Sequence, residues 1–331
     1  MLSSPRRDGT FDRAALRCAV RSTLLASAMA GCLWTGFSAE REPQQPRVSI
    51  APRPVKPTGG DSIRSNLRVD VRMVLVPATV TDQLERPVTD LPIESFRLYE
   101  DKIEQKVVSL FREDGPVSVG FVFDSSGSMR KRMDRSVAAI RQFLEGAMQG
   151  DEFLLVRFSD RPSLEQRFTG DGDAILSALS NARPEGSTAL LDAIYLGVTQ
   201  MRSARNPRRA MFVLTDGSDN SSRYTESEIV NLVRESDVRV YAIGLFEKSR
   251  FLEKTAIESG GKAYLAQKLK DLPETVDRLS NELRNQYILG YYPTNAVNDG
   301  KYRRVSVSLV PSDPPARMHV AWRRGYYAPV D

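Results

Sequence analysis

The chain has 331 residues, with 47 Lys plus Arg, 42 Asp plus Glu, one His and two Cys. Its length corresponds to about two ordinary domains, and 41% hydrophobic with 27% charged residues is a globular composition that excludes a disordered chain. The net charge of +5 lies entirely in residues 1–66, since the other 265 residues carry 37 charges of each sign. A nucleic-acid-binding protein normally keeps a basic face on its folded part, so we expect no nucleic-acid partner.

The N-terminal segment, residues 1–39, has the pattern of an export leader. Five Arg precede an apolar run at 24–37, which is the order of a bacterial secretion signal. The run is shorter than the ~20 apolar residues of a membrane-spanning helix, although an uncleaved anchor stays open. Cleavage after Ser38 and lipidation of Cys32 are alternatives. We expect an exported protein of the periplasm, the cell envelope or the medium, which contacts a membrane only through a lipid anchor at Cys32 or an uncleaved leader.

Residues 40–66 are expected to be a linker. Five Pro residues precede Gly59-Gly60 in this stretch. Proline fixes φ and removes backbone donors, so the segment is predicted to be an extended tether rather than a packed element.

Two stretches with strand-like alternation enclose the centre of the chain. Residues 67–113 contain three or four short apolar-alternating runs with turn signals between them, and residues 286–329 contain three more. A three-stranded sheet alone buries too little apolar surface to be stable. We therefore predict that 67–113 and 286–329 pair into one discontinuous, sandwich-like all-β domain.

Between these stretches, residues 115–285 alternate strands with helices. Near-continuous apolar runs at 117–123, 153–158, 210–214 and 238–245 predict strands that are buried on both faces. Apolar residues at helical spacing predict helices at 129–148, 174–182, 189–201, 227–236, 251–259 and 272–285. The expected fold is α/β, with a doubly wound, mostly parallel, Rossmann-like sheet inserted in the β-domain.

Side chains that could bind a metal through nitrogen or sulfur are scarce in the chain after the leader. Both Cys belong to the leader, which excludes zinc sites of the Cys/His type and Cys nucleophiles from the rest of the chain. The single His, His319, lies in an alternating run near the C-terminus and is expected to be a surface or edge-strand residue. A Ser-His-Asp triad would have to use it without any supporting motif.

Polar loops follow the predicted strands at the edge where ligands bind in such sheets. Residues 124–128 read Asp-Ser-Ser-Gly-Ser, residues 215–220 read Thr-Asp-Gly-Ser-Asp-Asn, and Gly-Ser-Thr at 186–188 precedes a helix. Carboxylates and hydroxyls are hard oxygen donors that suit Mg²⁺ or Ca²⁺. An ion held by three neutral hydroxyls and only two carboxylates is electron-poor, so it should accept one more carboxylate from outside.

The order Asp124-x-Ser126-x-Ser128, then Thr188, then Asp216 within Thr-Asp-Gly resembles the metal-ion-dependent adhesion site of the von Willebrand factor A domain family. This resemblance covers residues 115–285. It implies that the hydroxyls of Ser126, Ser128 and Thr188 bind Mg²⁺ directly, with Mn²⁺ or Ca²⁺ as alternative ions. The two Asp would act close to the metal, at least partly through water, and a partner's Glu or Asp would take the open coordination position.

The flanks carry a second resemblance, to the VWFA-related proteins abundant in Acidobacteria. It rests on the pattern from Val80 to Asp101 and on the ending Arg-Gly-Tyr-Tyr-Ala-Pro at 324–329, and Lys102 departs from it where Gly is usual. Near the metal motif, we expect Asp192 to be a structural hydrogen-bonding residue and Asp219 to be a turn or outer-shell residue.

We interpret the chain as an extracytoplasmic binding or adhesion module that recognises an acidic side chain of a protein partner through Mg²⁺. The alternative is a structural scaffold of a cell-envelope complex with metal-independent contacts. Catalysis is not expected. Ser126 stands where an aspartate-nucleophile phosphatase of the haloacid dehalogenase type needs its second Asp, and the chain has neither a Gly-x-Gly-x-x-Gly nor a Gly-Lys-Ser/Thr motif after a strand.

Overall fold

The computed structural model describes residues 53–54, 72–310 and 317–330. All of them belong to one compact unit of the chain. The predicted leader, with Cys32, and most of the predicted linker lie outside the described residues. Within the described part, no helix has the length and apolarity that crossing a membrane requires.

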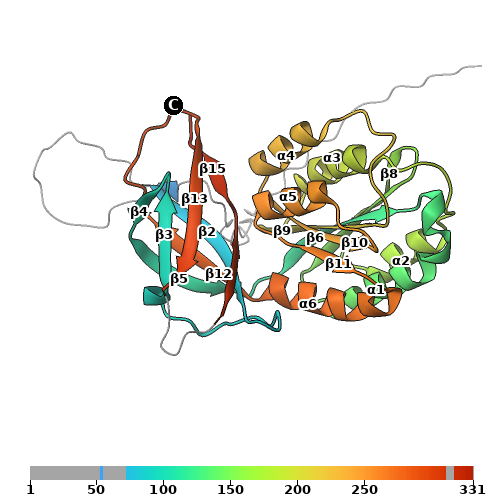
Figure 1. Cartoon of the computed structure of the whole chain (residues 1–331), viewed down its shortest axis with the longest axis horizontal. Coiled ribbons are helices and arrows are strands. Elements are labelled where there is room, and N and C mark those ends of the chain that lie inside the picture. The colour runs from blue at the N-terminus through green and yellow to red at the C-terminus, as the bar shows by residue number, and fades with distance from the viewer. Residues whose placement is uncertain (1–52, 55–71, 311–316, 331) are drawn as a thin grey trace, which may run out of the picture. The chain divides into compact units, whose positions relative to one another are not determined.

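A six-stranded sheet forms the centre of the α/β part (Figure 1). In order across the sheet, its strands are β11 (Ala263–Ala266), β10 (Val238–Leu245), β9 (Arg208–Thr215), β6 (Val117–Asp124), β7 (Glu152–Phe158) and β8 (Pro162–Thr169). Every neighbouring pair is parallel except β7 and β8. The chain therefore has a doubly wound α/β fold with a mixed sheet, and the antiparallel edge strand β8 is a finding that the sequence pattern did not predict.

Helices cover both faces of this sheet (Figure 1). One face packs against α1 (Met133–Glu145), α2 (Gly172–Ser180) and α6 (Leu272–Arg284). The other face packs against α3 (Leu190–Met201), α4 (Glu226–Glu235) and α5 (Arg250–Ser259). All eight residues of β6 are buried, because this central strand has a helical layer on each side. Each helix was expected near its observed place, but α1 starts later than predicted because a 3-10 turn occupies Gly127–Lys131.

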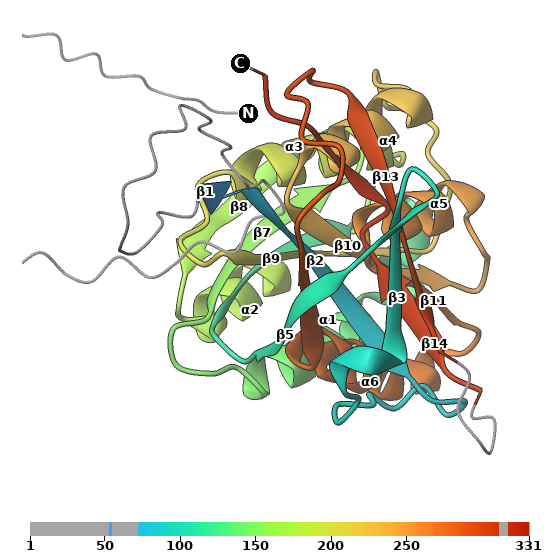
Figure 2. The ribbon, with the colours of Figure 1, turned by 90° about the vertical axis from the view of Figure 1, so that its left-hand side faces the viewer.

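The remaining strands make two antiparallel sheets (Figure 2). The first contains β1 (Arg53–Pro54), β2 (Arg72–Thr81), β12 (Gln286–Tyr291), β5 (Val107–Glu113) and β14 (His319–Trp322). The second contains β15 (Gly325–Tyr327), β13 (Tyr302–Leu309), β3 (Phe96–Glu100) and β4 (Ile103–Gln105).

Strands from the two ends of the chain alternate in these sheets. Strand β12 lies between β2 and β5, and β13 pairs with β3. Apolar residues of both sheets, among them Val76, Leu98 and Val307, share one buried core. The expected pairing of the two flanks is therefore observed. The further step, that these strands constitute a separate domain into which the α/β part is inserted, stays a prediction.

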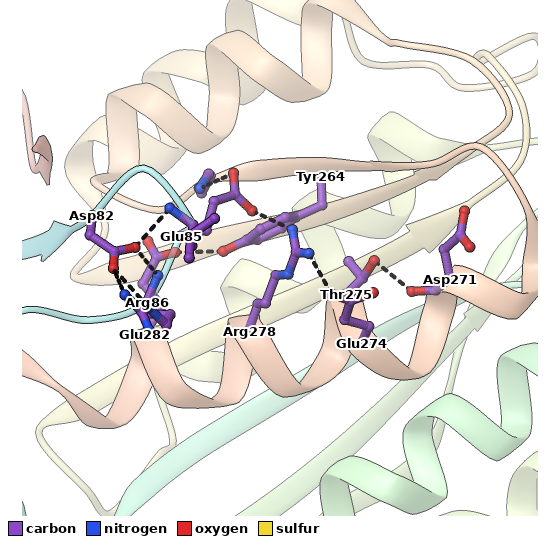
Figure 3. A network of polar contacts seen from close by, with 11 residues as sticks. Asp82, Glu85, Arg86, Tyr264, Asp271, Glu274, Thr275, Arg278 and Glu282 are labelled. Carbon is purple, nitrogen blue, oxygen red and sulfur yellow. Dashed lines mark hydrogen bonds and ion pairs between the residues drawn. The ribbon is translucent and has the colours of Figure 1, made fainter. Parts of the chain in front are cut away.

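A polar network joins the turn after β2 to the α/β part (Figure 3). Glu85 has a φ of 60° at the tip of this turn. Its Oε1 accepts a hydrogen bond from Lys262 Nζ at 2.8 Å, and its Oε2 accepts one from Arg278 Nη1 at 2.9 Å. One carboxylate thereby links the turn to α6 and to Lys262, which directly precedes β11.

Candidate metal centre

Asp124 is the last residue of β6 and its side chain is fully buried. Its Oδ1 accepts a hydrogen bond from the backbone amide of Ser126 at 2.8 Å, and its Oδ2 accepts one from Thr215 Oγ1 at 2.6 Å. Burial raises the pKa of this carboxyl, while the hydrogen bonds from Thr215 and Ser126 act in the opposite direction. Asp124 thus joins the ends of the adjacent strands β6 and β9 through a buried carboxylate.

The two serines of the motif continue this chain of contacts. The hydroxyls of Ser126 and Ser128 lie 3.0 Å apart, and Ser128 Oγ donates to Asp216 Oδ1 at 2.7 Å. The loop is also bonded to the end of strand β7, since the Ser125 amide donates to the carbonyl of Phe158 at 2.7 Å. Four of the five predicted site residues are therefore linked by hydrogen bonds at the carboxyl edge of the sheet.

Thr188, the fifth predicted residue, precedes α3 and is 5% exposed. Its amide donates to Asn220 Oδ1 at 2.8 Å, and the Asn220 amide donates to the Thr188 carbonyl at 3.0 Å. Its hydroxyl lies near Gly217, the residue after Asp216. A Cβ placed on Gly217 would be 3.8 Å from Thr188 Oγ1. The loop that carries Asp216 is thus the one that Thr188 contacts.

The two neighbouring carboxylates organise the loop after β9. Asp192 Oδ1 accepts from the amides of Arg223 and Tyr224 at 2.9 and 3.2 Å. Asp219 Oδ1 accepts from the amide of Leu191 at 3.2 Å and from Ser222 Oγ at 2.5 Å. These contacts agree with the structural role expected for Asp192 and with the turn role expected for Asp219.

Arg132 is a site residue that the sequence pattern did not indicate. Its Nη1 donates to the Ser128 carbonyl at 2.9 Å and contacts Asp216 Oδ2, a buried oxygen. The guanidinium also lies 4.7 Å from the centre of the Phe246 ring, and Phe246 has a φ of 73° with a 43% exposed side chain. Arg132 belongs to the basic run Arg130-Lys131-Arg132, so the sequence does not distinguish it from its neighbours. The only sequence feature that could have indicated its role is its spacing of four residues from Ser128.

The donor set fits a hard divalent cation. It consists of two carboxylates and three hydroxyls, all oxygen. Across the described ranges, no three His, Cys, Asp or Glu side chains gather in a way that would hold a metal. An ion here would therefore depend on hydroxyl oxygens for part of its coordination, with Asp124 and Asp216 supplying the negative charge.

Comparison with known proteins relates the α/β part to a described family. Residues 119–218 match the family model described as von Willebrand factor type A domain. The chain is 28% identical to inter-alpha-trypsin inhibitor heavy chain H4 of Sus scrofa over 203 residues, covering 56% of this chain and 22% of that protein. The chain thus spans about a fifth of the length of this curated relative.

Two solved structures are similar at low identity. The vWF domain of the type V pili tip protein Mfa5 from Porphyromonas gingivalis is 13% identical with a TM-score of 0.42, covering 51% of this chain and 95% of that one. Proximal thread matrix protein 1 from the mussel byssus, in a structure with a zinc-occupied MIDAS motif, is 17% identical with a TM-score of 0.46, covering 55% of this chain and 49% of that one. The family match therefore supports a von Willebrand factor type A domain within the central α/β part of the chain, at residues 119–218.

Proposed function

We propose that the protein is an extracytoplasmic binding module that recognises a protein partner through a divalent ion, Mg²⁺ in the first place. Domains of this type typically mediate adhesion between proteins. The observation that carries the proposal is the hydrogen-bonded series Asp124, Ser126, Ser128 and Asp216 at the carboxyl edge of the sheet, with Thr188 on the adjoining loop. The extracytoplasmic location rests on the leader-like sequence of residues 1–39.

The five residues of the candidate site would have two roles, coordination of the ion and neutralisation of its charge. The hydroxyls of Ser126, Ser128 and Thr188 would hold the ion, and Asp124 and Asp216 would balance its two positive charges. A bound ion supplies a Lewis-acidic position that attracts a carboxylate. Because the protein contributes two negative charges and Arg132 adds a positive one, a Glu or Asp of the partner would be electrostatically favoured there.

A metal-independent scaffold within the cell envelope is the second candidate. One observation favours it: the Arg132 guanidinium already contacts Asp216, so one of the two carboxylates has a cationic partner within the chain. In this case the exposed Phe246 and the polar loops would form the contact surface without an ion. For either candidate, we propose a non-catalytic role with no nucleic-acid partner, and a separate β-domain made of residues 67–113 and 286–329.

Calorimetry with Mg²⁺ and with Mn²⁺ tests the proposed site. We expect modest-affinity binding by the wild type and none by Asp124→Ala or Thr188→Ala. Asp90→Ala is the matched control, because Asp90 is exposed and belongs to the segment between β2 and β3. Equal binding by the wild type and Asp124→Ala would reject the site. A pull-down from envelope extract, run with Mg²⁺ and with chelator, then separates metal-dependent recognition from the scaffold.

A further inference from the structure

Arginine side chains converge at the opposite edge of the α/β sheet from the candidate metal centre. They surround a cavity of about 40 Å³ at the amino ends of β9 and β10, where these strands meet β2, β5 and β12. Its charged lining consists of Arg208, Arg209, Arg239, Arg323, Glu113 and Asp237. We propose that this cavity binds a small oxyanion of the phosphate or sulfate type.

Two of the guanidinium groups are held in place by backbone carbonyls and by the Asp237 carboxylate. Arg208 donates from Nη1 to the carbonyl of Gly115 and from Nη2 to that of Leu283, and its side chain is 3% exposed. Arg323 donates from Nη1 to Asp237 Oδ1 and from Nη2 to the carbonyl of Arg234, both at 2.8 Å. These bonds orient both groups in advance, which reduces the entropy lost when an anion binds.

Three of the four arginines that line the cavity retain a buried donor without a partner. The Nε atoms of Arg208, Arg209 and Arg323 are buried and make no hydrogen bond within the described part of the chain. Arg208 forms an ion pair with Glu113, whose Oε2 lies 3.8 Å from Nε, which is too far for a hydrogen bond. Buried donors are normally satisfied, and these three donors belong to residues that line one cavity, which points to a ligand with acceptor oxygens.

The charge balance leads to the same ligand class. Four guanidinium charges against the two carboxylates of Glu113 and Asp237 leave the lining with a net charge of +2. Burial lowers the pKa of both Arg208 and Arg323 and raises that of Glu113, which means that these charged groups are poorly solvated in the folded protein. A doubly charged oxyanion would neutralise the lining.

Size and location define what such an anion would do. The cavity volume of about 40 Å³ is on the scale of one to a few water molecules, so it limits the ligand to a single small oxyanion and excludes a nucleotide. Its walls come from the α/β part, through Arg208 and Arg239, and from the β strands, through Glu113 and Arg323, which directly follows β14. The anion would therefore link these two parts of the fold ionically and stabilise the folded chain.

Thermal unfolding in the presence of EDTA tests this proposal independently of the metal centre. Sodium sulfate and sodium phosphate are titrated from 0 to about 20 mM, with sodium chloride keeping the ionic strength constant. A bound anion raises the melting temperature along a saturating curve, as mass action requires, whereas general salt exclusion rises without saturation. Separate titrations show whether phosphate or sulfate is preferred.

Two substitutions that change the charge of the lining in opposite directions should change the anion affinity in opposite directions. Arg239→Met removes one cation and should weaken anion affinity at least about tenfold. Asp237→Asn removes a competing carboxylate and should tighten the affinity severalfold. Arg141→Met is the control, because Arg141 is exposed on α1 away from the cavity, and it should leave the curve unchanged.

A rise that never saturates, or saturating curves that are identical for the wild type, Arg239→Met and Asp237→Asn, would overturn the proposal. If Arg239→Met does not fold, Asp237→Asn decides alone, since this side chain is 42% exposed and its loss is compatible with folding. An unchanged or weakened affinity in that variant would contradict the proposed charge balance.

Discussion

Replacing Asp124 with Asn separates the architecture of the candidate metal centre from its charge. Asp124 accepts one hydrogen bond from the Ser126 amide and one from the Thr215 hydroxyl. Asn keeps a carbonyl oxygen for the amide, and the Thr215 hydroxyl can turn to accept from the new NH₂ group. Both hydrogen bonds are therefore retained, and the variant loses only their charge-assisted part, about 1 kcal/mol for each bond.

Burial acts in the opposite direction. It raises the pKa of Asp124, which means that the ionised carboxylate costs free energy in the folded protein, and Asn removes this cost. The two effects partly cancel, so we expect the unfolding free energy of the metal-free variant to lie within about 2 kcal/mol of the wild type.

Mg²⁺ then distinguishes the two proteins. An ion that binds only the folded state adds about 2.7 kcal/mol to the unfolding free energy when its concentration is 100 times its dissociation constant. The wild type should gain this amount, whereas Asp124→Asn should gain less than about 0.5 kcal/mol. The assay is urea unfolding followed by circular dichroism, with EDTA or with MgCl₂ at matched ionic strength. If Mg²⁺ stabilises Asp124→Asn as much as the wild type, Asp124 takes no part in ion binding and the reasoning is refuted.

Three further substitutions, two of which have a control variant, test the fold that supports the site. Ion pairs lower the pKa of Glu85 against the opposing effect of burial, so its stabilisation is present above the ordinary pKa of 4.5 and is lost as the pH falls through the lower folded value. Glu85→Gln should therefore cost under about 1 kcal/mol at pH 7 and less than that at pH 3, measured by urea unfolding at both. Gly260→Ala should cost about 1–3 kcal/mol, because Gly260 has a φ of 80° and a Cβ there would meet the backbone of residue 323 at 2.5 Å. Gly115→Ala, with nothing within 4 Å of the new Cβ, should change stability by less than about 0.5 kcal/mol, and an equal loss in both would contradict this account. Phe143→Ala should cost about 3–5 kcal/mol in thermal or urea unfolding, whereas the 40% exposed Phe111 should tolerate the same change far better.

The central strands and the helices were predictable because their apolar periodicity is local. Strand β10 occupies the predicted range 238–245, and seven of its eight residues are buried. Strand β8 was missed because Pro162–Thr169 is an edge strand with no fully buried residue, so its pattern resembles that of a polar loop. The start of α1 was placed too early because the 3-10 turn at Gly127–Lys131 continues the apolar spacing through Met129.

The sequence by itself predicted the α/β fold class and the five residues of the candidate site, because each follows from a periodicity or a motif within a short segment. Only the tertiary structure decided which distant residues share one environment. Arg132 became a site residue because Asp216, more than eighty positions later, lies against it. The arginine-lined cavity combines residues from β5, β9, β10 and the segment after β14. Such sites depend on long-range packing, which places charges from separate segments together and removes the water that would otherwise solvate them.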